Sequence, residues 1–441
     1  MPGFHELFLT VLLQLAAIVA AARLGAWAFR RAGQPEVVGE ILVGVLLGPS
    51  LLGKIAPSWM QLVPAPETEF CFRALSELGL VLFMFLIGLE FDFTHLRHVG
   101  RTASRVAVAG IVTPFALGAA TALAIHGSVA AETPRLGFTM FVATALSITA
   151  IPILGRIMIE LKIHRSRLGA LTITAAAVDD VLGWILLAGV SALVRDGFQA
   201  WPLVESLGLL IVFCAATFFV ARPLCLRLVH FAAGAPETSG AGAPRARQLD
   251  LAATAILLVF VLLSAAATSA IGVFAIFGPF VLGAALSRER PLAEAVTRQW
   301  RTLVYALLLP VFFTSTGLRT DVGRLDSPWM WGVCLLVIAA ATAGKMLGCG
   351  LAAWTGGCTI RESSCVAVMM NTRALMGLVA INVGRELGVV PDAVFTMLVL
   401  MALVTTVITT PILRRLIAGM PGLETEQPEH NLDTLAAPEG R

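Results

Sequence analysis

The sequence is poor in charge, since Asp, Glu, Lys and Arg make up 13% of its 441 residues, and it contains a single tyrosine. In soluble domains charged residues are roughly a quarter of the chain. This shortage excludes a soluble globular protein, because such a protein needs a charged and polar surface. The formal net charge of +3 says little by itself, and we expect no nucleic acid partner.

The sequence also lacks the cysteine and histidine patterns of a metal or redox site. Its seven cysteines are scattered without a C-x-x-C pair, and its seven histidines do not cluster. We interpret the cysteines as small packing residues and expect no cofactor. No basic stretch precedes the first apolar run, which favours a retained first helix over a cleaved signal peptide.

What the chain has is apolar sequence, with 58% hydrophobic residues and a mean hydropathy of +0.87. Because spanning a lipid bilayer takes roughly 20 apolar residues, this predicts an all-α multi-pass membrane protein with one transmembrane domain at about 1–417. Hydropathy indicates about thirteen transmembrane helices. They lie near residues 8–27, 37–52, 72–92, 104–125, 137–159, 168–193, 202–231, 250–268, 271–287, 302–318, 329–353, 362–384 and 392–413. The second and ninth are short, so a count of twelve stays open.

The basic residues indicate an orientation, because cytoplasmic loops carry an excess of Lys and Arg. Of the 31 Lys and Arg residues, twenty follow odd-numbered segments and seven follow even-numbered segments. This asymmetry supports thirteen segments in a cell (inner) membrane. It places the N-terminus outside and the C-terminus in the cytoplasm.

The order of the segments predicts two inverted repeats. A stretch rich in Ala, Gly and Pro at about 232–247 is typical of a mobile link. Six segments precede the seventh and six follow it, so an offset of seven relates repeat one, about 8–193, to repeat two, about 250–413, with opposite orientation. The polar tail at 418–441 is predicted to be disordered.

Two adjacent carboxylates, Asp179 and Asp180, interrupt the apolar segment at 168–193. A charged Asp at the centre of a membrane helix costs about 2.5–3.5 kcal/mol on the insertion scale, which favours a functional site. The alternative is a pair of buried acids held by packing partners without ion chemistry. Neighbours on a helix point about 100° apart, so one acid can face a cavity while the other pairs. Burial and a neighbouring carboxylate both favour the protonated form, so cation and proton can compete.

The segment at 137–159 carries the hydroxyls of Thr144, Ser147 and Thr149 ahead of Pro152. Proline removes a helix hydrogen bond, and broken backbone at membrane depth is tolerated where it is buried in protein or faces a cavity. Free carbonyls, hydroxyls and half-helix ends can hold a small cation. A structural kink explains the same residues equally well.

Lys345, Asn371 and Arg373 are further polar residues in the middle of apolar segments. Lys345 lies about 13 Å from the nearer end of its segment at the helical rise, which favours an internal partner, Asp179 or Asp180, over snorkelling. Arg373, with Asn371 beside it, needs carbonyls or an acid as partners. Arg373 either takes part in ion chemistry or acts as a purely structural clamp.

Several short stretches between about residues 34 and 413 form a series in chain order. They are Gln34-Pro35, Gly48-Pro49-Ser50, Ser147 to Pro152, Glu160-Leu161-Lys162, Ala177 to Trp184, Phe312 to Leu318 and Asn371 to Met376. Together they resemble the second branch of the monovalent cation:proton antiporters, with its Kef-type members and its plant and fungal cation/proton exchangers.

This resemblance implies thirteen helices in two inverted repeats, two crossing broken helices, and a homodimer. It implies that Asp180 is the main carboxylate for cation and proton and that Asp179 pairs with Lys345. It also implies that Ser147 and Thr149 lie at the helix crossing. In that family an acidic pair accompanies charge-moving exchange, so Asp179 favours electrogenic exchange.

We therefore expect a transporter rather than an enzyme, a secondary active antiporter that exchanges Na⁺ or K⁺ for protons by alternating access and serves pH homeostasis. Asp180 would bind either the monovalent cation or protons. A passive cation channel is the alternative. An intramembrane aspartyl protease is disfavoured, because it needs aspartates on two helices and the sequence has no GxGD motif. The sequence does not distinguish Na⁺, K⁺ and Li⁺, since all are hard cations with oxygen ligands.

Overall fold

The computed structural model of this chain describes residues 4–55, 66–90, 100–149, 153–154, 157–158, 161, 163, 166–195, 200–232, 249–271, 275–418 and 420. These residues are almost entirely helical, and no strand occurs among them. Helices satisfy every backbone hydrogen bond within the segment, which is what an apolar segment in lipid requires.

The helices follow the predicted apolar segments. They are α1 (Phe4–Arg31), α2 (Glu36–Leu47), α3 (Leu52–Ile55), α4 (Pro66–Glu90), α6 (Arg101–Val129), α7 (Arg135–Ser147), α9 (Arg167–Arg195), α10 (Ala200–Ala216), η2 (Thr217–Ala221), α11 (Arg222–Ala232), α12 (Leu251–Ala270), α13 (Phe277–Leu286), α14 (Arg290–Leu303), η3 (Val304–Leu308), α15 (Leu309–Leu318), η4 (Val322–Arg324), α16 (Pro328–Thr355), α17 (Ile360–Met370), α18 (Ala374–Glu386) and α19 (Asp392–Ile417). Among the described residues, ten helical segments are long and apolar enough to cross a membrane. The other three predicted segments contain the shorter helices α7, α13 and the pair α17 and α18. The count of thirteen crossings stays a prediction.

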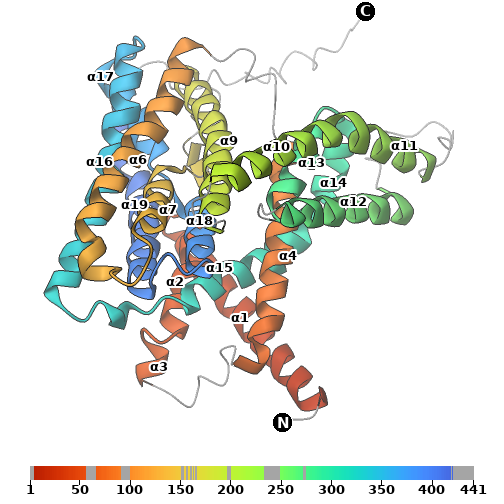
Figure 1. The fold of residues 1–441 in the computed structure, drawn as a ribbon, viewed down its shortest axis with the longest axis horizontal. Helices are drawn as coiled ribbons and strands as arrows, with labels where there is room; N and C mark the ends of the chain where they lie inside the picture. The colour runs from red at the N-terminus through yellow and green to blue at the C-terminus, as the bar shows by residue number, and fades with distance from the viewer. Residues whose placement is uncertain are drawn as a thin grey trace, which may run out of the picture.

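The helices form two bundles, seen side by side in Figure 1. The core bundle, at the left, consists of α6, α7, α9 and α16 to α19, which pack on one another. The second bundle, at the centre and right, consists of α1, α2, α4 and α12 to α15. The continuous helix α10–η2–α11 packs on α9 at one end and on α12 at the other, so it joins the two bundles.

The helix pairs repeat under the offset of seven segments. The offset relates α2 to α13 and α4 to α15. In the second bundle α2 packs on α15, and the related helices α13 and α4 also pack on each other. Both pairs meet at glycines: a Cβ on Gly44 would lie 2.9 Å from Gly317 Cα, and one on Gly88 would lie 3.0 Å from Gly283 Cα. In the core bundle, α6 packs on its own equivalent, α16.

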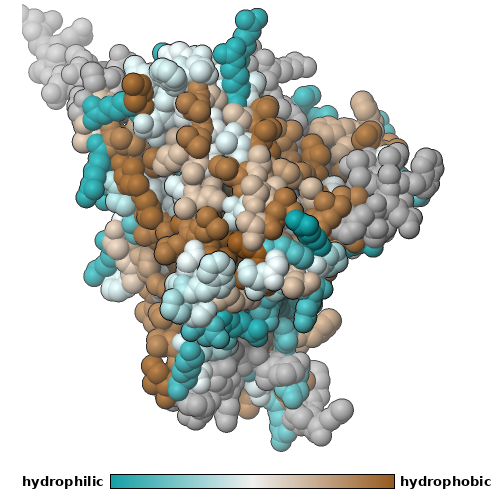
Figure 2. All heavy atoms as spheres, turned by 60° about the vertical axis from the view of Figure 1, so that its left-hand side comes forward, coloured by the Kyte–Doolittle hydropathy of each residue, from teal (hydrophilic) through white to brown (hydrophobic). Residues whose placement is uncertain are grey.

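Apolar side chains cover much of the face shown in Figure 2. Among the exposed apolar residues of the protein are Leu335, Leu336, Leu347 and Leu351 of helix α16. Exposed leucines along a whole helix are expected where the solvent is lipid. The buried interior of the core bundle, in contrast, contains the charged residues that the sequence singles out.

Some predicted features fall outside the described residues. They are Pro152, the link at 232–247 beyond Ala232, and the tail at 418–441 apart from Ala418 and Met420.

Candidate functional site

Helix α7 ends in the middle of the core bundle, at Ser147. Ile148 is extended, with φ −74° and ψ 140°, and Thr149 follows it. The Ser147 hydroxyl donates to the carbonyl of Thr144 at 2.8 Å, and the Thr144 hydroxyl donates to that of Met140 at 2.7 Å. The predicted interruption of this segment therefore lies at residues 148 and 149, ahead of Pro152.

A second helix is interrupted at the same depth. Helix α17 ends at Met370, the residues Asn371, Thr372 and Arg373 leave the helix, and α18 begins at Ala374. Two hydrogen bonds hold this turn. Both the backbone amide and the side-chain hydroxyl of Thr372 donate to the carbonyl of Met369. The sequence places these polar residues in mid-segment, and the structure shows that they break the helix.

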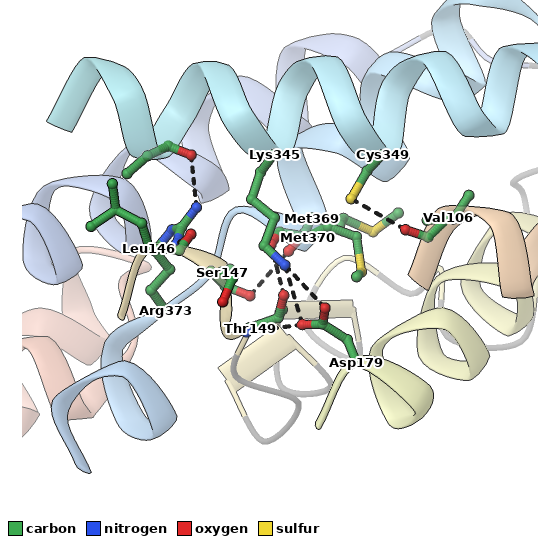
Figure 3. Close-up of polar contacts among 12 residues, drawn as sticks. Val106, Leu146, Ser147, Thr149, Asp179, Lys345, Cys349, Met369, Met370 and Arg373 are labelled. Carbon is green, nitrogen blue, oxygen red and sulfur yellow. Dashed lines mark hydrogen bonds and ion pairs between the residues drawn. The ribbon is translucent and has the colours of Figure 1, made fainter. Parts of the chain in front are cut away.

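The two interruptions cross and bind each other (Figure 3). The Thr149 hydroxyl donates to the Met370 carbonyl at 3.1 Å. In the other direction, the Arg373 guanidinium donates to the carbonyl of Leu146, and to that of Ala341 on α16 at 2.7 Å. The last carbonyls of a helix carry partial negative charge, so the fully buried Arg373 neutralises the end of α7.

Asp179 of α9 lies directly beside this crossing. Its Oδ2 accepts the backbone N–H of Thr149 at 3.0 Å. Both of its oxygens lie 3.2 Å from Nζ of Lys345, and both side chains of this salt bridge are 0% exposed. Figure 3 shows Lys345 reaching from α16 across to Asp179. Lys345 thus has an internal partner and does not reach the membrane surface.

Small residues explain why Lys345 is buried so deeply. Helix α16 lies directly on α6, where a Cβ added to Gly344 would be 2.6 Å from Pro114 Cα. A Cβ on Gly348 would clash with the carbonyl oxygen of Ala109. This close contact leaves Lys345 no route to solvent, so its ammonium group turns to the carboxylate of α9.

Asp180 has a different environment from its neighbour. It is 2% exposed, and its Oδ1 has no hydrogen-bond partner in the part of the chain that the structure describes. The side-chain oxygen of Asn371 is likewise buried and without a partner among the described residues. Buried polar atoms are normally paired, so the Asp180 oxygen is suited to a bound cation or proton and the Asn371 oxygen to a cation.

The structure brings only some of the predicted site residues into direct contact. Thr149, Asp179 and Lys345 form one hydrogen-bonded group, and Arg373 joins the same crossing through the carbonyl of Leu146. Ser147 lies at the end of α7 but donates only to its own helix. The role of charge pairing expected for Asn371 is not seen, because its amide oxygen is left without a partner among the described residues.

The carbonyls of Leu146, Ala341 and Met370 are functional groups that sequence reasoning missed. Any residue type supplies a carbonyl, so no side chain marks these positions. Cys349 is buried one helical turn from Lys345, and its Sγ lies 3.8 Å from the carbonyl of Val106, which fits the predicted packing role.

Comparison with known proteins places this architecture in a family. The family model described as "Sodium/hydrogen exchanger, transmembrane" matches residues 17–418. The chain is 36% identical to the Na(+)/H(+) antiporter NhaS4 of Synechocystis over 92% of this chain and 96% of that protein. It is 37% identical to Cation/H(+) antiporter 17 of Arabidopsis thaliana over 93% of this chain and 48% of that protein. The chain spans about half the length of the plant relatives that it matches.

A solved structure supports the fold. The sodium proton antiporter MjNhaP1 from Methanocaldococcus jannaschii superimposes with a TM-score of 0.59, covering 95% of this chain and 100% of that chain at 16% sequence identity. Sequence, helix arrangement and family match agree that this is a multi-pass membrane protein. The chain belongs to the transmembrane sodium/hydrogen exchanger family.

Proposed function

We propose that this chain exchanges a monovalent cation, Na⁺ or K⁺, for protons across a membrane. The observation that carries the proposal is the buried oxygen of Asp180, which has no partner among the described residues beside a neighbour whose oxygens are satisfied. The relatives support the same activity, because they include a Na(+)/H(+) antiporter of Synechocystis and a K(+)/H(+) antiporter of Saccharomyces cerevisiae.

The arrangement explains how one carboxylate couples two ions. Charge in a low-dielectric interior is costly, so Asp180 is stable there when a cation or a proton neutralises it. A cation and a proton compete for the same oxygens, so each leaves when the other binds. The broken helices bring backbone carbonyls and the Thr149 hydroxyl to the crossing beside Asp179, the neighbour of Asp180, and such groups can replace part of the water around a cation.

Alternating access follows from the two bundles. The core bundle carries Asp179, Asp180 and Lys345, and it moves against the second bundle when Asp180 is neutralised. An empty, charged Asp180 raises the energy of crossing, which prevents leak. Exchange of one cation for one proton at Asp180 alone moves no net charge. We expect electrogenic exchange because of the acidic pair, and this requires that the Asp179–Lys345 pair also takes up and releases a proton in each cycle.

The remaining architecture is part of the same proposal. Two inverted repeats, at about 8–193 and 250–413, are supported by the exchange of helix pairs under the offset of seven segments. We further propose thirteen crossings in a cell membrane, an outside N-terminus and a homodimer. This orientation rests on the distribution of Lys and Arg.

The test is cation-driven proton movement in proteoliposomes that contain the pure protein. We expect Na⁺ or K⁺ to drive proton efflux with the native chain and with Asp250→Asn, which changes an exposed carboxylate at the start of α12. Asp180→Asn should abolish it. Unchanged flux in Asp180→Asn would refute the role of Asp180, and cation current without proton counter-flux would indicate a channel.

A further inference from the structure

A cavity of about 400 Å³ lies between the core bundle and the second bundle. Helix α18 of the core bundle lines one wall, and α4 and α15 of the second bundle line the other. The proposed orientation places the lining ends of these helices on the outer side of the membrane. The cavity is thus bounded by the two bodies that alternating access moves against each other.

One face of α18 forms the core wall of this cavity. Its lining residues are Val379, Asn382, Val383 and Glu386, the spacing of one helical face. Val379 lies about 9 Å along the helix from Arg373 at the rise of 1.5 Å per residue. The wall therefore runs from near the helix crossing to the end of α18.

Two serine hydroxyls lie in the opposite wall. Ser76 of α4 and Ser315 of α15 both line the cavity, and the Oγ of each is buried without a hydrogen bond to the described residues. Ser76 is 8% exposed, so its hydroxyl has little access to bulk solvent. Hydroxyl oxygens are ligands that hard cations accept.

A carboxylate of the core bundle faces these hydroxyls across the cavity. Glu386, whose side chain is 31% exposed, binds Arg73 of α4, with 3.1 Å between Oε1 and Nη2. The same guanidinium lies 3.3 Å from Glu77 on its own helix. Arg73 therefore keeps an acidic partner if it leaves Glu386. The other charged residues that line the cavity are Glu69, Arg195 and Arg319, and Arg319 pairs with Glu69 at 3.3 Å.

We propose that this cavity is a second cation site, in which Glu386 supplies the negative charge and the hydroxyls of Ser76 and Ser315 supply neutral ligands. Arg73 pairs with Glu386 in the structure, so a cation competes with Arg73 for this carboxylate. The inference rests on the proposed function, because the site would collect the monovalent cation that Asp180 exchanges. A cation that enters displaces Arg73 from Glu386, and Arg73 stays with Glu77. Loading the cavity thus breaks one ion pair between the two bundles and weakens the contact that holds them together.

The test compares two variants that break the same ion pair. Right-side-out and inside-out vesicles give the half-saturating cation concentration at each membrane face, with whichever of Na⁺ or K⁺ drives flux in the native chain. Glu386→Gln should raise this concentration about threefold to fivefold at one face only, as removal of one partly exposed charge would. Arg73→Gln should lower it by a similar factor at that face, because the competitor is gone. Glu67→Gln, an exposed change on the same helix, should have no effect.

Opposite shifts of the half-saturating cation concentration in the two variants distinguish a cation site from an ion pair that only holds the two bundles together. If both variants shift the half-saturating concentration in the same direction, or neither does, the inference is wrong. Sodium NMR line broadening by Asp180→Asn protein tests binding without transport. The broadening that remains in this variant should fall when Glu386→Gln is added, and a result without that fall overturns the inference. Absence of exchange in the native chain would count instead against the proposed function, and the binding measurement would still decide this one.

Discussion

The salt bridge of Lys345 and Asp179 is fully buried, which makes each charge depend on the other. Removing one partner of a buried pair leaves an uncompensated charge and costs about 3–5 kcal/mol, whereas replacing both is often neutral. We expect Lys345→Gln to lower the free energy of unfolding by about this amount. Unfolding by titration with a denaturing detergent measures the change.

The control is the double variant Asp179→Asn with Lys345→Gln. It should recover most of the stability that Lys345→Gln loses, because no lone charge is left. If the double variant loses the sum of the two single losses, the pair contributes no coupling and the argument for its mutual dependence fails.

Thr149 contributes a hydroxyl and a backbone amide to different partners. The amide binds Asp179 and is kept in any substitution except proline, while the hydroxyl binds the Met370 carbonyl. Thr149→Val should therefore destabilise the crossing by about 0.5–1.5 kcal/mol, the usual net value of one hydrogen bond, and Thr149→Ser should not. The same detergent titration checks both. Equal loss in the two variants would point to packing of the methyl group instead.

Charged residues of the site could be predicted because each one is expensive in an apolar segment. Asp179, Lys345 and Arg373 stand out in the sequence for this reason. The partners of Arg373 could not be predicted, since they are carbonyls of Leu146 and Ala341 and depend on which helices meet. The choice between Asp179 and Asp180 as partner of Lys345 likewise depends on how α9 is rotated, and the resemblance rather than the residues favoured Asp179.

Helix packing in the second bundle depends on glycines that let backbones touch. On α4, a Cβ at Gly88 would clash with the carbonyl oxygen of Phe280 on α13. Overpacking of this kind costs about 1–3 kcal/mol, so Gly88→Ala should reduce the free energy of unfolding by that amount. Detergent titration again gives the value. Because the offset of seven segments relates Gly88 to Gly317, Gly317→Ala should cost a similar amount.

A glycine on an open helix face provides the matched control. Nothing lies within 4 Å of a Cβ added to Gly189 of α9. Alanine is the better helix former by up to about 1 kcal/mol, so Gly189→Ala should be neutral or stabilising. A loss in Gly189→Ala equal to that in Gly88→Ala would mean that the substitution itself, and not the contact, destabilises the protein.

The helices themselves follow from the apolar runs, but their ends do not. Proline chemistry predicted a break in the segment at 137–159, and α7 ends at Ser147, several residues before Pro152. The extended backbone there is held by Asp179, whose oxygen accepts the Thr149 amide from another helix. A contact between distant segments decides this helix end, so local propensity could not locate it.

The number and order of apolar segments were enough to predict an offset of seven, but the packing partners were not. That α6 lies on α16, and α4 on α13, is decided by small residues such as Gly344 and Gly88, whose role is visible only when the facing backbone is known. Each of the two proposed repeats contributes helices to both bundles, so the division into bundles does not follow the order of the chain. No single stretch of sequence carries that division.

The relative movement of the two bundles that we propose can be tested by a cross-link. Asn382 of α18 lies 3.3 Å from the Thr316 hydroxyl of α15, so these side chains join the bundles beside the cavity. With the seven native cysteines replaced, Asn382→Cys with Thr316→Cys should lose cation/proton exchange on oxidation and regain it on reduction. Flux in proteoliposomes before and after each treatment measures this.

A cross-link within one bundle separates movement from chemical damage. Ser50 and Thr320 follow α2 and α15 of the second bundle, and the Ser50 hydroxyl donates to the Thr320 carbonyl at 2.9 Å. Oxidised Ser50→Cys with Thr320→Cys should keep exchanging ions, because the bond lies inside a body that does not change shape. Exchange that survives a complete cross-link between Asn382→Cys and Thr316→Cys would contradict movement of the core bundle against the second bundle. Transport would then have to occur by rearrangement within the core bundle alone, at the crossing where Thr149 and Arg373 hold the broken helices.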